Sequence, residues 1–373
     1  MRVVVVGPLS TWMVNFRGEM LRAIVAAGHE ALAVAPEDDP EVRTSFSRMG
    51  VAFAPYPLQR AGLNPFRDLR TVRHLRHLFR EFRADVVLCY AAKPVIYGML
   101  AGRLAGVPLR AAMITGIGSV LQASEGFRQR TLRAVLRSLY RIALRQAQVV
   151  FFQNPDDQRL FQASGLVGPA NTLVRINGSG VDLRHYAPAP IPPAPVRFLM
   201  VGRLIRDKGL MEYVAAARQA RSTIPEARFQ LLGPLDTNPT AISREELDSW
   251  QAEGAIEYLG STGDVRPFLA AAHVCVLPSY GEGTPRSVLE AMAMARPVIV
   301  TDVPGCRETV EPGGNGLMVP VRDSRALARA METLAGDRGT LEAMARRSRA
   351  IAEERFDVHS VNRVILGELG LLR

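Results

Sequence analysis

Residues 273–290 read HVCVLPSYGEGTPRSVLE, and this stretch predicts a strand, a loop and the start of a helix. The run 273–277 is short and apolar, as buried strands are, and the proline and glycines after it mark a loop. Thr284 is a favoured helix N-cap and Pro285 suits a first helical turn, so we expect a helix that continues through Glu290. A strand that leads through a short loop into a helix is the repeating unit of a parallel α/β sheet.

The same alternation of short apolar runs and helices fills both halves of the 373-residue chain. Such runs indicate parallel sheets that helices cover on both faces. We therefore expect an α/β protein with two Rossmann-like parallel-sheet domains, facing each other across a cleft at the carboxyl ends of their strands. The runs are 3–6, 31–35, 51–53, 85–89, 109–114 and 148–152 in the first half, and 197–201, 228–232, 255–258, 273–277 and 297–300 in the second.

A proline-rich stretch, APAPIPPAP at 187–195, divides the chain almost in half. Five prolines in nine residues exclude a helix or a central strand and favour a stiff, extended connector. We expect a first domain at 1–186, a linker at 187–195 and a second domain at 196–373, whose last helix is able to pack back on the first domain. The net positive charge follows the same division. Residues 1–190 contain 24 Lys and Arg against 13 Asp and Glu, whereas residues 191–373 contain 22 against 23.

Two predicted helices of the first half, within 66–83 and 128–145, carry much of the excess positive charge. In the second, four arginines three or four residues apart share one face beside an apolar stripe. This pattern fits an ordinary surface helix of an arginine-rich protein or a helix that docks on an anionic membrane surface. Nucleic acid is not the expected partner, because no basic motif is interleaved with aromatic residues. The four arginines are Arg130, Arg133, Arg137 and Arg141.

Composition and missing motifs exclude several classes of protein. With 48% hydrophobic and 22% charged residues the chain is globular, and no apolar run reaches the roughly 18 residues of a membrane-spanning helix. Three widely spaced cysteines argue against a disulfide framework and fit a reducing cytoplasm. No G-x-G-x-x-G follows the first strand, which argues against a nicotinamide dehydrogenase. No metal is expected, since D-x-D is absent and no His/Cys cluster has ligand spacing.

The loop and helix start at 279–290 have the features of an anion site. The amino end of the predicted helix points out of the strand ends, where free N–H groups and the helix dipole favour a diphosphate. Glu282 lies just before that point and Glu290 about a turn and a half into the helix. Two carboxylates that flank an anion site suit a ligand with hydroxyl groups on both sides of its phosphates, as in a nucleotide sugar.

A second loop, VGRLIRDKG at 201–209, also follows a predicted strand and opens a helix. Arg203 and Lys208 could reach one phosphate group from this loop. Lys208 is one of only two lysines among 46 basic residues, the other being Lys93. A lysine that survives such arginine bias indicates a site where a compact ammonium group is needed.

These motifs resemble those of the retaining glycosyltransferases of family four, which have the GT-B fold. The resemblance rests on the E-x7-E pair Glu282 and Glu290, the G-R-x4-K-G loop at 202–209 and the sequence NGSGVD at 177–182, and it covers essentially the whole chain. The run 281–308 looks like a branch that builds bacterial surface polysaccharides and lipopolysaccharides. Members of that branch move hexoses or N-acetylhexosamines from UDP-sugars to polyprenyl-diphosphate-linked or lipopolysaccharide-linked saccharides.

The resemblance implies a role for each matching residue. Arg203 and Lys208 would bind the diphosphate and stabilise it as it leaves, and Glu282 would hold the donor sugar. Glu290 would hydrogen-bond the ribose hydroxyls. The other implied donor contacts are Gly283, Thr284, Pro285, Gly7, Gly202, Asp264 and Val265, and the candidate donor or acceptor contacts are Lys93, Thr115 and Gly116. The chain departs from many relatives at Gly281, where they have Arg, and at Ala295, where they have Gly.

The resemblance and the residues together predict a retaining, metal-independent hexosyltransferase that uses a UDP-sugar and a lipid-linked saccharide. We expect it in the cytoplasm, peripheral on the inner face of the cytoplasmic membrane. Two alternatives stay open at this point: a UDP-sugar epimerase of the same fold, and a catalytically silent subunit that binds nucleotide sugars.

Overall fold

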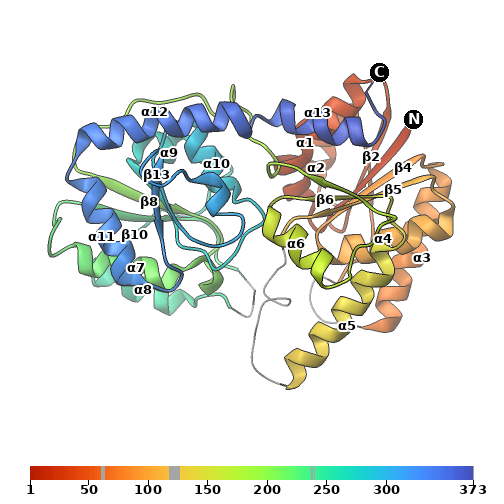
Figure 1. Ribbon diagram of the computed structural model, residues 1–373, viewed down its shortest axis with the longest axis horizontal. Coiled ribbons are helices and arrows are strands. Elements are labelled where there is room, and N and C mark those ends of the chain that lie inside the picture. Colours follow the sequence, from red (N-terminus) through yellow and green to blue (C-terminus); the bar gives the residue numbers. More distant parts are fainter. Residues whose placement is uncertain (60–63, 117–126, 237, 239, 373) are drawn as a thin grey trace. The chain divides into compact units, whose positions relative to one another are not determined.

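The computed structural model describes residues 1–59, 64–116, 127–236, 238 and 240–372. The chain forms two units: the first comprises Met1–Ser179 and Val358–Arg373, and the second Gly180–Asp357. Each unit is a parallel sheet covered by helices, which confirms the expected α/β class with two Rossmann-like domains (Figure 1). In the described parts of the chain, no helix is both long enough and apolar enough to cross a membrane.

The first unit has a seven-stranded parallel sheet in the order β3-β2-β1-β4-β5-β6-β7. Strand order reverses between β1 and β4, which pair in the register Val3 to Val86, and binding sites of such sheets lie at the carboxyl ends beside this point. The strands are β1 (Arg2–Val6), β2 (Glu30–Ala35), β3 (Ala52–Pro55), β4 (Val86–Tyr90), β5 (Leu109–Ile114), β6 (Val149–Phe152) and β7 (Thr172–Arg175).

Helices cover both faces of this sheet, so the side chains of its central strand are buried on both faces. Val3 and Val5 of β1 pack in one apolar cluster and Val4 and Val6 in another, as alternation along a strand requires. The first cluster contains residues of α1 and α13, and the second contains residues of α3, α4 and α5. The helices are α1 (Ser10–Ala26), α2 (Pro40–Arg48), α3 (Pro65–Glu81), α4 (Ala92–Ala105), α5 (Phe127–Leu144), α6 (Pro155–Ala163) and α13 (Val358–Glu368).

The second unit has a six-stranded parallel sheet in the order β10-β9-β8-β11-β12-β13. Here the order reverses between β8 and β11, which pair through Phe198 and Val274. The loops that follow these two strands therefore start side by side at the carboxyl edge of the sheet. The strands are β8 (Arg197–Val201), β9 (Arg228–Leu232), β10 (Glu257–Tyr258), β11 (Val274–Leu277), β12 (Val298–Thr301) and β13 (Gly316–Val319).

The helical segments of the second unit surround one continuous apolar core. Two of them are the next helical segments after the paired strands β8 and β11. A short loop joins β8 to η1, and a longer loop joins β11 to α10. They are η1 (Arg206–Lys208), α7 (Leu210–Ala220), α8 (Arg244–Ala252), α9 (Arg266–Ala271), α10 (Arg286–Ala293), η2 (Arg307–Thr309), α11 (Ser324–Ala335) and α12 (Arg338–Arg355).

The chain divides after Ser179 and again after Asp357, so the boundaries differ from the expected 1–186 and 196–373. The first division falls inside the sequence NGSGVD at 177–182, where Gly178 and Gly180 have φ of 66° and 67°. Residues from 358 onward return to the first unit as α13, which packs on α1.

The proline-rich stretch 187–195 belongs to the second unit rather than joining the two. The backbone N–H of Ala189 donates to the Met294 carbonyl at 3.3 Å. Arg296, whose side chain is completely buried, donates to the carbonyls of Ala189 and Pro190. A segment without regular structure is thus held along the sheet by hydrogen bonds to its carbonyl groups, which a proline-rich sequence retains.

Candidate functional site

The two loops at the carboxyl ends of β8 and β11 meet through an ion pair. Lys208, the last residue of η1, places its Nζ 2.5 Å from Oε1 of Glu282 in the loop before α10. Both side chains are largely buried, with exposed fractions of 21% and 13%. The backbone N–H of Tyr280 donates to the carbonyl of Asp207 at 2.9 Å, which fastens one loop to the other. The structure therefore brings together two of the three predicted catalytic residues.

Two glycines make this close approach possible. Gly209 follows Lys208 with φ of 76°, and a Cβ there would lie 2.0 Å from the carbonyl oxygen of Pro278. Gly305 has φ of 83°, and a Cβ there would lie 2.4 Å from the carbonyl oxygen of Glu282. Both positions combine a left-handed backbone with backbone contact, so only glycine fits without displacement. The loop that carries Glu282 thus packs closely against the loops after β8 and β12.

The start of α10 differs from the expected one. The helix begins at Arg286, and Pro285 occupies the cap position with φ of −73° and ψ of 112°. Thr284 does not cap the helix, because its Oγ1 donates to the Gly283 carbonyl at 3.0 Å instead. Within the described residues no side chain accepts a hydrogen bond as the cap of α10. The N–H groups of its first turn are not taken by a capping side chain, as a helix start that binds an anion requires.

Glu290 lies on α10 and is only 8% exposed. Its Oε1 accepts one hydrogen bond from the Tyr186 hydroxyl and one from Nε of Arg286, each at 2.9 Å. Sequence reasoning missed both donors. Arg286 carries a usable signal, since residues i and i+4 of a helix are neighbours on its surface. Tyr186 carries none, because it lies 104 residues before Glu290.

Arg203, the third predicted catalytic residue, is held in a different way. It lies just after β8, and its NH1 donates to Oδ2 of Asp236 at 3.0 Å. Asp236 follows β9, the neighbouring strand, and sequence reasoning also missed it. A Cβ added at Gly202 would meet nothing within 4 Å, so packing inside this unit does not explain the glycine there.

Asp264 and Val265 lie at the start of α9, with Val265 in the cap position. The carboxylate of Asp264 accepts hydrogen bonds from Arg266 through its backbone N–H, Nε and NH2 at 3.0, 2.8 and 2.7 Å. These hydrogen bonds lower the pKa of Asp264 to about 2. Asp264 is therefore a negatively charged acceptor whose orientation Arg266 fixes.

The predicted residues of the first unit follow three neighbouring strands. Gly7 comes directly after β1, Lys93 two residues into α4 after β4, and Thr115 and Gly116 directly after β5. They share the carboxyl edge of one sheet, which is where such sheets bind ligands. A Cβ at Gly7 would lie 2.3 Å from the hydroxyl oxygen of Tyr90, so packing alone requires this glycine.

Lys93 contacts a backbone carbonyl group. Its Nζ donates to the carbonyl oxygen of Gln59 at 2.6 Å. Partial burial lowers the pKa of Lys93, and the negative charge of Asp68 opposes that shift. The ammonium group thus lies beside Gln59, in the loop that follows β3.

Models of two glycosyltransferase domain families match the chain. The model described as "Glycosyl transferase 4-like domain" matches residues 13–178, and the one described as "Glycosyl transferases group 1" matches residues 195–337. The two matches cover the sheets of both units. The chain belongs to the retaining glycosyltransferases of family four.

Two relatives of this glycosyltransferase are named as transferases that act on diphosphoundecaprenol-linked sugars. It is 29% identical to the N,N'-diacetylbacillosaminyl-diphospho-undecaprenol alpha-1,3-N-acetylgalactosaminyltransferase of Campylobacter jejuni, over 87% of this chain and 86% of that one. It is 26% identical to the UDP-Gal:alpha-D-GlcNAc-diphosphoundecaprenol alpha-1,3-galactosyltransferase of Escherichia coli, over 73% and 72% of the two chains.

Solved structures share its GT-B fold. The crystal structure of HepE from Anabaena in complex with UDP-glucose superposes with a TM-score of 0.79, at 20% identity and over the full length of both chains. The sucrose-phosphate synthase of Thermosynechococcus elongatus superposes with a TM-score of 0.81, at 19% identity, over 99% of this chain and 98% of that one.

The basic face of α5 in the transferase is less uniform than the sequence indicates. Arg130 is exposed, and Arg133 and Arg137 are partly exposed. Arg141 instead donates through Nε to the Gly165 carbonyl and through NH2 to the Ser164 carbonyl, each at 3.1 Å. Arg141 therefore anchors the loop after α6, and of the four arginines Arg130 is the most exposed.

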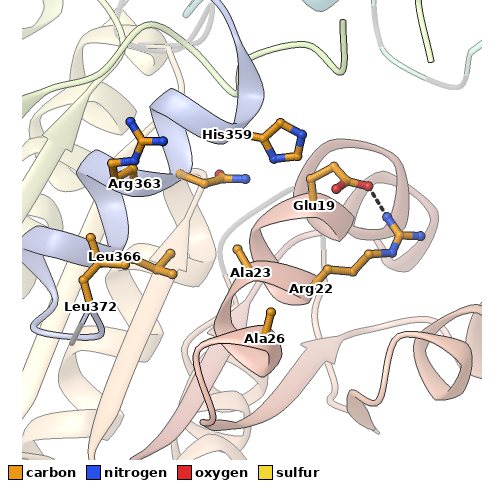
Figure 2. A pocket seen from close by; sticks show the side chains of 9 residues that line it. Glu19, Arg22, Ala23, Ala26, His359, Arg363, Leu366 and Leu372 are labelled. Carbon is orange, nitrogen blue, oxygen red and sulfur yellow. Dashed lines mark hydrogen bonds and ion pairs between the residues drawn. The ribbon is translucent and has the colours of Figure 1, made fainter. Parts of the chain in front are cut away.

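A pocket of about 390 Å³ lies between α1 and α13 in the first unit (Figure 2). Its polar rim includes the ion pair of Glu19 with Arg22, together with His359 and Arg363, and its apolar wall includes Leu366. None of the predicted site residues lines it. The predicted chemistry is instead located in the loops at the carboxyl edges of the sheets.

Proposed function

We propose that the transferase moves a hexose or an N-acetylhexosamine from a UDP-sugar to a lipid-linked saccharide in the synthesis of a bacterial surface polysaccharide or lipopolysaccharide. The observation that carries the proposal is the ion pair of Lys208 with Glu282 beside the start of α10. A cation, a carboxylate and a helix start that has no capping side chain among the described residues suit a phosphate that is bonded to a sugar. The names of the curated relatives support the lipid-linked acceptor.

In this proposal the donor spans the site from Glu290 to Glu282. Glu290 accepts hydrogen bonds from the ribose hydroxyls, Lys208 and Arg203 contact the diphosphate, and Glu282 accepts hydrogen bonds from the hydroxyls of the transferred sugar. The Lys208 ammonium then bonds to a phosphate oxygen while Glu282 remains beside it. This order of groups matches the order of ribose, diphosphate and sugar along a nucleotide sugar.

The reaction retains configuration without an enzymatic nucleophile. The bond between the anomeric carbon and the diphosphate oxygen breaks, and UDP takes the electron pair. The acceptor hydroxyl oxygen bonds to the anomeric carbon from the same face and gives its proton to an oxygen of the departing diphosphate. Lys208, Arg203 and the first turn of α10 stabilise the negative charge that develops on UDP, so the reaction needs no metal ion.

The acceptor binds on the first unit in this proposal, at the sheet edge that carries Gly7, Lys93, Thr115 and Gly116. Its lipid keeps the enzyme at the inner face of the cytoplasmic membrane. The exposed arginines at the start of α5 add attraction to anionic headgroups.

The test is release of UDP from a panel of UDP-hexoses and UDP-N-acetylhexosamines in excess EDTA, with and without bacterial lipid extract. Lipid-dependent release from one donor is the expected result and names that donor. Release that requires added Mg²⁺ or Mn²⁺ would contradict metal independence. A donor that isomerises without lipid would indicate an epimerase, and a protein that releases no UDP from any donor would contradict the proposal.

A further inference from the structure

The two donors to Glu290 converge on one of its two carboxylate oxygens. The Tyr186 hydroxyl and Nε of Arg286 both donate to Oε1, each at 2.9 Å. Within the part of the chain that the structure describes, Oε2 of Glu290 accepts no hydrogen bond. A carboxylate oxygen has two lone pairs, so Oε1 is saturated and Oε2 is the oxygen left for a ligand.

The three side chains form a closed arrangement with little freedom. The guanidinium carbon of Arg286 lies 5.9 Å from the centre of the Tyr186 ring, within the range of a cation–π contact. NH1 of Arg286 also donates to the Gly180 carbonyl at 2.9 Å. The side chains of Arg286 and Glu290 are 16% and 11% exposed, so water competes little for these hydrogen bonds.

The backbone frame behind this cluster is held by Arg349 of α12. NH1 of Arg349 donates to the carbonyls of Tyr186 at 3.0 Å and of Ala293 at 2.7 Å. One guanidinium group therefore ties the segment of Tyr186 to the end of α10, the helix that carries Glu290. The position of the tyrosine relative to the carboxylate is fixed by backbone as well as by side chains.

Tyr186 remains a donor under all physiological conditions. Burial raises the pKa of Tyr186 well above its usual value of 10, and the charge of Glu290 raises it further. The phenol thus keeps its proton and donates it to the Glu290 carboxylate. A neutral donor and a permanent cation on the same oxygen hold the carboxylate plane in one orientation.

We propose that Tyr186 and Arg286 are positioning residues of the donor site, which aim Oε2 of Glu290 at the ribose hydroxyls. This inference rests on the proposed function, because it takes Glu290 as the ribose acceptor. Neither residue touches the nucleotide. They set its affinity and its ribose selectivity by fixing the one acceptor oxygen that remains.

The experiment compares the dissociation constants of UDP and 2′-deoxy-UDP by calorimetry on the full chain. The wild type is expected to bind UDP about tenfold more tightly, the size of a hydrogen bond to a charged acceptor. Tyr186→Phe removes one donor to Oε1, and we expect the preference for UDP to fall to about threefold. Arg286→Lys keeps the charge but loses the Nε donor, and we expect a similar fall.

Tyr213→Phe is the matched control. Tyr213 is fully buried in the same unit, and its hydroxyl donates to the Phe198 carbonyl at 2.9 Å, away from Glu290. Removing the Tyr213 hydroxyl should lower the thermal stability of the protein but leave the ratio of the two dissociation constants unchanged. A merely structural role of Tyr186 would give the same pattern as this control.

The possible outcomes distinguish a failure of the positioning role from a failure of the proposed function on which it rests. A wild type that binds both nucleotides equally, or neither, would show that the ribose does not lie at Glu290, and both proposals would fall. A wild type that prefers UDP, with the same preference in Tyr186→Phe and Arg286→Lys, would overturn the positioning role alone. If Tyr186→Phe does not fold, Arg286→Lys decides the question by the same ratio.

Discussion

Two loops of the second unit contact each other through an ion pair, whereas the described contacts between the loops of the first unit are hydrogen bonds to or from backbone groups. Lys208 and Glu282 lie 2.5 Å apart although they belong to different loops. In the first unit, Lys93 donates to a backbone carbonyl and Gly7 is fixed by the Tyr90 ring beside it. The predicted site of the second unit is thus held together by a charge pair, while the predicted residues Gly7 and Lys93 of the first unit are held by packing and by a hydrogen bond to backbone.

This difference predicts that single substitutions lower activity most strongly when they lie in the second unit. An organised charge pair is sensitive to the loss of one partner, because the other is then left partly buried and uncompensated. Residues held by packing at a sheet edge contribute shape and affinity instead.

Lys208→Ala and Glu282→Gln should each lower kcat by about 100-fold or more, because each removes a group that acts on charge or sugar in the transition state. The measurement is UDP release with saturating donor and acceptor. Arg218→Ala and Glu253→Gln are the controls, since they break an exposed ion pair of the same unit. Near-normal turnover in both site variants would contradict the assignment of the donor site.

Charge reversal at the start of α5 should weaken binding to anionic vesicles. The double variant Arg130→Glu/Arg137→Glu should bind about 30-fold more weakly, at roughly 1 kcal/mol for each basic side chain near the surface. Arg325→Glu/Arg329→Glu on the exposed face of α11 makes the same charge change as a control. Equal sedimentation of both double variants with vesicles would indicate that α5 does not dock on a membrane.

Arg141 offers an internal comparison on the same helix. Because it donates to the carbonyls of Gly165 and Ser164, Arg141→Glu should lower the melting temperature more than Arg130→Glu does. Thermal denaturation followed by circular dichroism measures this difference. Equal melting temperatures would show that these hydrogen bonds contribute nothing to stability.

Asp236→Asn should raise KM for the donor by about threefold with little change in kcat, because it weakens the ion pair that orients Arg203. Asp248→Asn, which affects the exposed pair with Arg244, is the control. A large loss of kcat with unchanged KM would mean that Asp236 contributes to the chemical step instead.

Ala295→Gly should raise the melting temperature slightly and leave activity unchanged. Ala295 follows α10 with φ of 58°, a left-handed conformation that costs a residue other than glycine about 1–2 kcal/mol. Glycine relieves this strain, although its greater freedom in the unfolded chain offsets about 0.5–1 kcal/mol. The departure from relatives at this position is therefore a matter of stability. A lower melting temperature in Ala295→Gly would contradict this account.

Local sequence patterns predicted the positions of most strands in both sheets. Nearly every expected apolar run coincides with a strand to within about two residues, because hydrophobic runs report burial directly. Two edge strands were missed, β7 and β13, each only four residues long. β13 begins with Gly316, where a Cβ would lie 2.0 Å from the Val298 carbonyl, so close strand contact rather than a β-forming side chain specifies it.

Residues close together along the chain specify the α/β class, the glycine-bounded loops and the spacing of Glu282 and Glu290, so these features could be predicted without a structure. Tertiary structure decided the partners: Lys208 lies 74 residues before Glu282, and Tyr186 lies 104 residues before Glu290. It also placed the return to the first unit at Val358, the start of a helix that the sequence predicted to pack back there. Hydrophobic periodicity states which residues are buried, but which loops meet is set by strand order, and no short stretch of sequence encodes that order.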